Sequence, residues 1–82
     1  MLVRLLYFAG VRDVTGVAEE TLELPPDIRT VGDFETFLVR RYPALTAHAA
    51  SLRYARNEAF AEPIETLDEG DIVAVIPPVA GG

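Results

Sequence analysis

The sequence contains no cysteine and no lysine, and these two absences exclude several kinds of site. Without cysteine there is no disulfide scaffold, no zinc–thiolate site and no thiol nucleophile. All 7 basic residues are arginine, so no side-chain amine is present to attack an activated acyl group. The only histidine, His48, lies close to the only serine, Ser51, but no acidic residue nearby is placed to orient a catalytic triad. We therefore predict that the chain has no self-contained active site.

Positive charge is also scarce, because the chain has 13 acidic residues and 7 basic ones, which gives a net charge of −6. Binding to nucleic acid requires clustered positive charge, so we expect no nucleic-acid partner. No apolar segment approaches the length of a membrane span, and the opening stretch MLVRLLYFAG lacks the features of a signal peptide. We expect one cytoplasmic domain that does not bind membranes.

Two pairs of adjacent acidic residues are the remaining candidates for acid–base or metal chemistry. Neighbours in a strand point to opposite faces, so Glu19 and Glu20 are predicted to be solvated charges rather than a catalytic pair. Asp68 and Glu69 precede Asp71 without the alternating ligand spacing of a calcium loop. This stretch is predicted to be a turn before a strand, and no metal site is expected.

The hydrophobic pattern predicts a small α+β fold. Strands are expected at 2–8, 17–24, 51–57 and 71–77, with another short strand near Phe60. Turns are expected at 9–16, 57–58 and 64–71, while 44–50 is either irregular or a short turn of helix. The clearest helix spans 30–43, where Thr30 and Asp33 have the spacing of a capping box. Its predicted buried residues are Val31, Phe34, Phe37 and Leu38.

The last strand, residues 71–77, is apolar on both faces, which predicts a central, covered position parallel to the first strand. A mixed sheet with one main helix packed across one face is a β-grasp arrangement. If Val3, Leu5 and Tyr7 face that helix, Phe8 must face away from it, because strand neighbours alternate. By the same reasoning, Ile76 points away from the core, and such exposed apolar residues usually mark an interface.

We predict a β-grasp domain over residues 1–76 and an extended tail over 77–82. Pro77 and Pro78 fix φ and favour an extended path, so the tail reaches on the order of 20 Å. Gly81 and Gly82 have no side chains and fit a narrow slot that excludes other residues. The unhindered carboxylate of Gly82 becomes reactive only after activation, for example as an acyl-adenylate.

Four stretches carry a family resemblance over nearly the whole chain: VRLLYFAGVRDVTG, TVGDFETFLVRRYP, ARNEAF and LDEGDIVAVIPPVAGG. On these motifs the sequence resembles the sulfur carriers of the ubiquitin-like β-grasp family, and among them the small subunits of molybdopterin synthase. The last stretch is the most specific, because Gly-Asp, an apolar strand, Pro-Pro-Val and a final Gly-Gly occur together.

The resemblance implies that an E1-like adenylating enzyme activates Gly82 with ATP and magnesium and that a sulfur donor converts it to a thiocarboxylate. The sulfur then passes to cyclic pyranopterin monophosphate in the active site of a large subunit, for molybdenum cofactor biosynthesis. The large subunit supplies the catalytic side chains in a heterotetramer, so this chain is not an enzyme alone and binds no cofactor itself.

The resemblance also assigns the site residues. The family's partner interface maps onto Phe8, Phe60 and Ile76. The residues that thread the tail into the partner are Pro77, Pro78, Val79, Ala80 and Gly81, and the reactive terminus is Gly82. Two positions depart from the family pattern: Ile76 replaces a frequent aromatic residue, and Arg56 replaces a small apolar one.

Three alternatives remain open from the sequence. The chain could carry sulfur for cysteine or thiazole synthesis, because those carriers share the fold and the Gly-Gly end. It could be a protein modifier joined through Gly82 to lysines of other proteins, although without lysine it cannot form lysine-linked chains of itself. It could also be a ubiquitin-like binding module with an inert tail.

Overall fold

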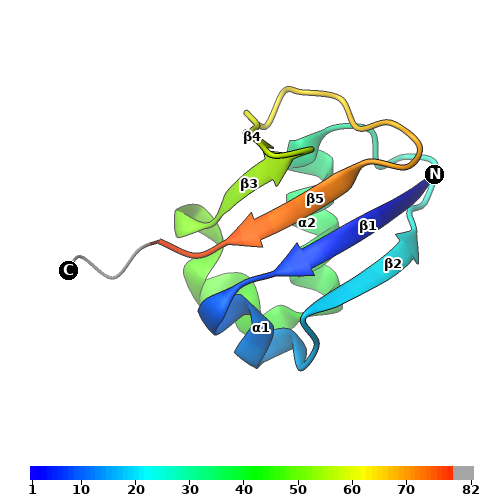
Figure 1. The fold of residues 1–82 in the computed structure, drawn as a ribbon. Helices are drawn as coiled ribbons and strands as arrows, with labels where there is room; N and C mark the ends of the chain where they lie inside the picture. Colours follow the sequence, from blue (N-terminus) through cyan, green and yellow to red (C-terminus); the bar gives the residue numbers. More distant parts are fainter. Residues whose placement is uncertain (79–82) are drawn as a thin grey trace.

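A computed structural model describes residues 1–78 of the chain. These residues form a mixed five-stranded sheet in the order β2-β1-β5-β3-β4, with helices on one side (Figure 1). The strands are β1 (Leu2–Tyr7), β2 (Glu19–Glu23), β3 (Arg53–Arg56), β4 (Ala59–Phe60) and β5 (Ile72–Ile76). The helices are α1 (Ala9–Thr15), α2 (Val31–Arg41) and the 3₁₀ helix η1 (Pro43–Ser51). The predicted α+β, β-grasp fold class is confirmed.

Strand β5 lies in the middle of the sheet. It runs parallel to β1, where Leu5 is opposite Val73, and antiparallel to β3, where Tyr54 is opposite Val75. The predicted parallel pairing of the first and last strands is therefore confirmed. Because β5 is hydrogen-bonded on both edges, its end at Ile76 is held firmly in the plane of the sheet.

The prediction that this strand is covered on both faces is wrong. Val73 and Val75 are fully buried, but Ile72 is 39% exposed and Ala74 and Ile76 are only half-buried. Within residues 1–78 no helix lies over this second face, because the helices share the opposite side (Figure 1). We call it the open face. It carries Leu2, Arg4 and Leu6 of β1 and Ile72, Ala74 and Ile76 of β5.

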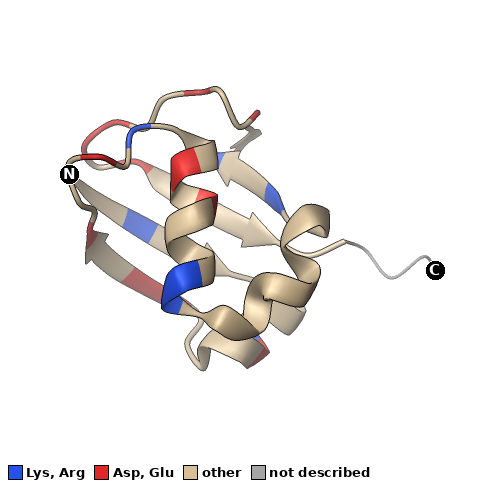
Figure 2. Cartoon of the chain, turned by 180° about the vertical axis from the view of Figure 1, so that it is seen from behind, with Lys and Arg blue, Asp and Glu red and all other residues tan. Residues whose placement is uncertain are grey.

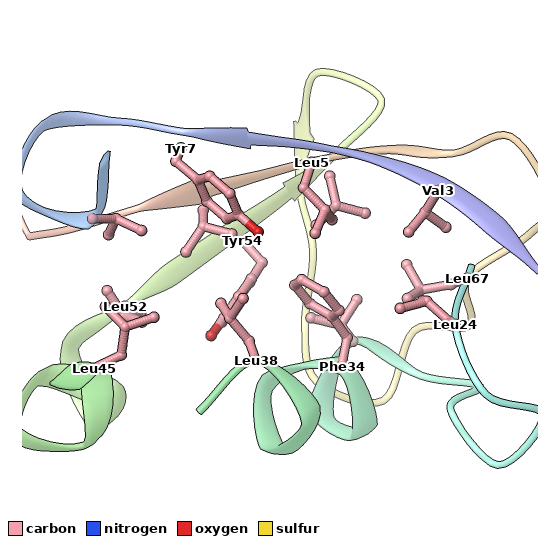
Figure 3. Packing of buried hydrophobic residues seen from close by; sticks show 14 residues of the cluster. Val3, Leu5, Tyr7, Leu24, Phe34, Leu38, Leu45, Leu52, Tyr54 and Leu67 are labelled. Carbon is pink, nitrogen blue, oxygen red and sulfur yellow. The ribbon is translucent and has the colours of Figure 1, made fainter. Parts of the chain in front are cut away.

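The core lies between the sheet and α2. Phe34 and Leu38 of α2 are fully buried against side chains of β1, β3 and β5 (Figure 3). The ring of Phe34 meets Tyr54 edge-on, with the centroids 5.9 Å apart. Phe37, also predicted to face the core, is only partly buried at its margin. The odd-numbered residues of β1, from Val3 to Tyr7, complete the packed layer as expected.

The predicted capping box at the start of α2 is confirmed. The Thr30 hydroxyl accepts a hydrogen bond from the Asp33 N–H at 3.1 Å. The Asp33 carboxylate accepts bonds from the N–H groups of Arg29 and Thr30, at 3.0 and 3.1 Å. These bonds, that from Arg29 foremost, lower the pKa of the Asp33 carboxyl. Because several backbone N–H groups are satisfied here, the position at which α2 begins is well defined.

Residues 9–16 do not form the predicted turn but the short helix α1. Val11 is 2% exposed and anchors this helix in the core. Gly16 ends it in the left-handed region, at φ 81°, and its N–H donates to the Arg12 carbonyl at 2.8 Å. The local signal for a helix is weak here because glycine and β-branched residues are poor helix formers. Packing of Val11 therefore decides the local structure.

Candidate functional site

The candidate site is the end of β5, where the predicted tail begins. Ile76 is opposite Arg53 of β3, and the Phe8 N–H beyond β1 donates to the Val75 carbonyl at 3.4 Å. Pro77 is half-buried and Pro78 is exposed. The predicted tail residues Val79, Ala80, Gly81 and Gly82 lie outside the described residues, so the extended tail stays a prediction. The described structure supplies the platform from which that tail starts.

The three residues predicted as a partner interface lie at this end of the sheet. Phe8 is 47% exposed, Phe60 is 67% exposed and Ile76 is half-buried. We call these three residues the exit patch. The sheet register also places Leu6, Ala74, Ala55 and Phe60 in one row across the open face. The two alanines leave a low surface between the bulkier side chains, and an apolar surface of this kind is typical of a docking site.

An apolar groove adjoins the exit patch. It has a volume of about 720 Å³ and lies between α1, η1 and the end of β5. Its lining residues include Phe8, Val14, Leu45, His48, Ile76 and Pro78. Helix η1 contains no Asp, Glu, Lys or Arg and carries no charge colour in Figure 2. Helix α1 does contain Arg12 and Asp13, but neither of them lines the groove. The groove therefore suits apolar side chains rather than a charged ligand.

Sequence reasoning missed the groove, because its residues come from three segments that are far apart in the chain. Val14 was placed in a turn, and His48 was read only as a surface residue. His48 is indeed exposed, but it lies at the groove and not beside an acid that would orient it for catalysis. The available signal was the short apolar helix η1, whose lack of charge is unusual for a surface segment in a chain with net charge −6.

Glu20 is not the solvated charge that was predicted. Its carboxylate accepts hydrogen bonds from the hydroxyls of Tyr7, at 2.5 Å, and Tyr42, at 2.7 Å. Arg41 pairs with the same carboxylate at 3.2 Å. Burial acts to raise the pKa of Glu20, but the bonds from both tyrosines and from Arg41 outweigh it and lower the pKa. The cluster fastens β1 and β2 to the end of α2, so its role is structural.

We expect the stability of the Glu20→Gln variant to decrease less in acid than the stability of the wild type does. The folded-state pKa of Glu20 lies below 4.5, so its ionised form stabilises the fold above that pH. This stabilisation disappears as the pH falls through the folded-state pKa. The free energy of unfolding of the wild type should exceed that of the variant by about 1–2 kcal/mol at neutral pH and by much less in strong acid. Urea unfolding at a series of pH values measures the difference.

The matched control for this prediction is Glu19→Gln. The Glu19 carboxylate forms an exposed pair with Arg4 at 2.8 Å, and such surface pairs contribute at most about 1 kcal/mol. Its effect should be small across the whole pH range. A stability difference between Glu20→Gln and wild type that stays constant from neutral pH into acid would show that ionisation of Glu20 does not stabilise the fold.

The structure gives Arg56, one of the two departures from the family pattern, a definite role. Its guanidinium bonds Asp71 at 2.6 Å and Asp68 at 2.7 Å. Asp71 is 6% exposed and also accepts bonds from the Asn57 side chain and the Asp68 N–H. Burial acts to raise the pKa of Asp71, but these bonds lower it. The network fixes the start of β5 and confirms the turn expected before it.

Two further kinds of site are not found among residues 1–78. No group of three or more His, Asp and Glu side chains there is arranged to hold a metal ion. None of the helices in this described part of the chain has the length and apolar character that would be needed to span a bilayer. The candidate features that the described region does offer are two surfaces, the exit patch and the groove beside it.

Comparison with known proteins agrees with this description. A model of the ThiS family matches residues 5–82. The chain belongs to the ThiS family. This ThiS-family chain is 38% identical over 84 residues to the molybdopterin synthase sulfur carrier subunit of Chlamydomonas reinhardtii, and the match covers 100% of both chains. The predicted resemblance to sulfur carriers is thereby confirmed.

Solved structures place the ThiS-family chain among two kinds of proteins. A putative molybdopterin converting factor subunit 1 from Pyrococcus furiosus has a TM-score of 0.83 and 31% identity, and the match covers 96% of this chain and 99% of the other. The small archaeal modifier protein SAMP1 from Haloferax volcanii has a TM-score of 0.82 and 29% identity, with 100% of both chains covered.

Proposed function

We propose that this chain is the sulfur-carrier small subunit of a molybdopterin synthase. The observation that carries the proposal is the full-length similarity to a protein named molybdopterin synthase sulfur carrier subunit. The fold supports it, because the central strand β5 leads toward the predicted tail beside an exposed apolar patch. A carrier needs this arrangement, since its body must dock on a partner while its terminus enters the partner's active site.

The proposed chemistry takes place on the Gly82 carboxylate. An E1-like enzyme transfers the adenylyl group of ATP to this carboxylate with the help of magnesium and releases pyrophosphate. A donor that supplies sulfur at the sulfide level then attacks the acyl carbon and displaces AMP, which leaves a thiocarboxylate. The chain itself binds no cofactor in this scheme. Because it has no lysine, it offers no side-chain amine that would consume the activated acyl group before sulfur arrives.

The second part of the proposal concerns the large subunit of the synthase. Phe8, Phe60 and Ile76 dock on that subunit, and residues 77–81 thread Gly82 into its active site. There the thiocarboxylate gives its sulfur to cyclic pyranopterin monophosphate, with catalytic side chains from the large subunit. Two small and two large subunits form the complete enzyme. Support for docking comes from the exposure of Phe8 and Phe60 on a small domain, where large apolar side chains are normally buried.

The test is an intact-mass measurement after incubation with the adenylating enzyme, ATP and a sulfur source. We expect the mass of the chain to increase by the exchange of one oxygen for sulfur, located on Gly82 by fragmentation. Addition of the large subunit and the pterin precursor should then return the carboxylate form and yield the dithiolene product. A chain that stays unmodified, or that keeps its sulfur in the presence of both, would refute the proposal.

A second candidate is a protein modifier joined through Gly82 to lysines of other proteins. The structural similarity to a small archaeal modifier protein favours it. The same mass experiment, run in a lysate, separates the two functions. A modifier gives amide-linked adducts that survive thiols and hydroxylamine, whereas a carrier alone gives the thiocarboxylate. A carrier for cysteine or thiazole synthesis would form the thiocarboxylate but would not transfer it to the pterin precursor.

A further inference from the structure

Arg53 lies between two members of the exit patch. It begins β3 directly opposite Ile76 of β5. Its guanidinium carbon is 5.4 Å from the centroid of the Phe60 ring, which is the geometry of a cation–π contact. The residue is exposed, and its partners in register place it on the open face. A partner that covers Phe60 and Ile76 must therefore cover Arg53 as well.

Arg53 differs from the other arginines of the strands in its electrostatic surroundings. Arg4 pairs with Glu19, and Arg56 pairs with Asp68 and Asp71. Among residues 1–78, no carboxylate lies within ion-pair distance of Arg53. Its stacking on an aromatic ring orders the planar guanidinium and leaves the N–H groups at its edge available for a bidentate acceptor.

The unpaired charge of Arg53 affects the binding free energy strongly when a partner covers it. A charged group that is removed from water without an acceptor costs several kcal/mol, enough to cancel the gain from a buried aromatic side chain. The partner therefore needs a hydrogen-bond acceptor at this position, and an anionic acceptor compensates the buried charge best. A carboxylate fits the fork of the guanidinium. Its negative charge is attracted to the local positive charge of Arg53, although the net charge of the whole carrier is −6.

We propose that Arg53 forms an ion pair with a carboxylate of the large subunit and so selects the partner that docks on the exit patch. This inference rests on the proposed function, because it takes the large subunit as the protein that covers the patch. Phe8, Phe60 and Ile76 supply the apolar contact, which many proteins could match. Arg53 rejects those that present an apolar or basic group at this point, because its charge would then be left without an acceptor.

The test measures the dissociation constant for the purified large subunit from the same organism, with four variants of the carrier. Arg53→Glu should weaken binding by at least about 10-fold at low salt, Arg53→Gln by less, and Arg53→Lys least because it keeps the charge. At about 1 M salt, where the screening length is about 3 Å, the difference between wild type and Arg53→Glu should shrink markedly. The control is Arg40→Glu on α2, which changes the net charge equally on the other side of the sheet and should leave affinity within about 2-fold.

The possible results separate this inference from the proposed function. If wild type binds the large subunit and Arg53→Glu binds equally well at low salt, the ion pair is refuted and the proposed function stands. If Arg53→Lys loses as much affinity as Arg53→Gln, with no effect of salt, Arg53 acts only by stacking on Phe60 and the inference is also wrong. If wild type itself does not bind, both fail.

Discussion

Addition of one serine after Gly82 should abolish sulfur transfer and leave the fold unchanged. One added residue moves the reactive carboxyl by about 3.5 Å and attaches a side chain where the slot accepts none. Misplacement of a reacting group by as little as about 1 Å can cost about 100-fold in rate, so the loss should exceed that figure. Deletion of Gly82 should have an effect of the same size. Single-turnover transfer from the carrier to the pterin precursor measures it.

Two measurements on the same samples serve as controls. The thermal unfolding midpoint of each variant should match that of the wild type, because Val75 is the last residue of the packed core and lies well before Gly82. Affinity for the large subunit should fall far less than the transfer rate, because the exit patch is intact. Full transfer activity in the chain with the added serine would show that the chemistry does not reside in the Gly82 carboxyl.

Phe60→Ala should weaken binding to the large subunit by about 30-fold or more without destabilising the carrier. An aromatic residue at the centre of an interface commonly contributes about 2 kcal/mol or more to the binding free energy. A loss of about 2 kcal/mol corresponds to about 30-fold in the dissociation constant. The side chain is 67% exposed in the free chain, so its removal should change the free energy of unfolding by less than about 0.5 kcal/mol. Calorimetric titration and urea unfolding give the two quantities.

Leu2→Ala is the matched control for this variant. Leu2 lies on the same open face and is 43% exposed, but it is at the opposite end of β1 from Phe8. Its truncation should leave the affinity almost unchanged. Equal losses for Phe60→Ala and Leu2→Ala would mean that the partner covers the whole sheet rather than the exit patch, and no loss for either would mean that it binds elsewhere.

Local patterns in the sequence predict most of the framework of this fold. The alternation in β1 and the capping box of α2 are signals carried by a few neighbouring residues, and both are found as expected. Helix α1 was missed because its seven residues form a helix only when Val11 is packed into the core. Such a tertiary contact has no counterpart in local helix propensity.

In the candidate site, too, local patterns predict some features, while others depend on contacts between distant residues. The outward orientation of Phe8 follows from strand alternation, and its exposure agrees with that reasoning. The interaction of Glu20 with Tyr7 and Tyr42 joins residues 13 and 22 positions apart, and no spacing rule links them. The last strand was expected to be covered on both faces because an apolar pattern has the same appearance whether its cover is the chain's own helix or another protein, yet Ile72 is 39% exposed.

The central position of β5 also has a mechanical consequence. A pull applied beyond Pro78 acts along the axis of β5, which is hydrogen-bonded to β1 on one edge and to β3 on the other. Both rows of bonds are then loaded in shear and must yield together, whereas an edge strand would peel away one bond at a time. An enzyme that unfolds proteins by pulling on this end of the chain, such as an unfoldase, therefore first has to extract a strand that is hydrogen-bonded on both edges.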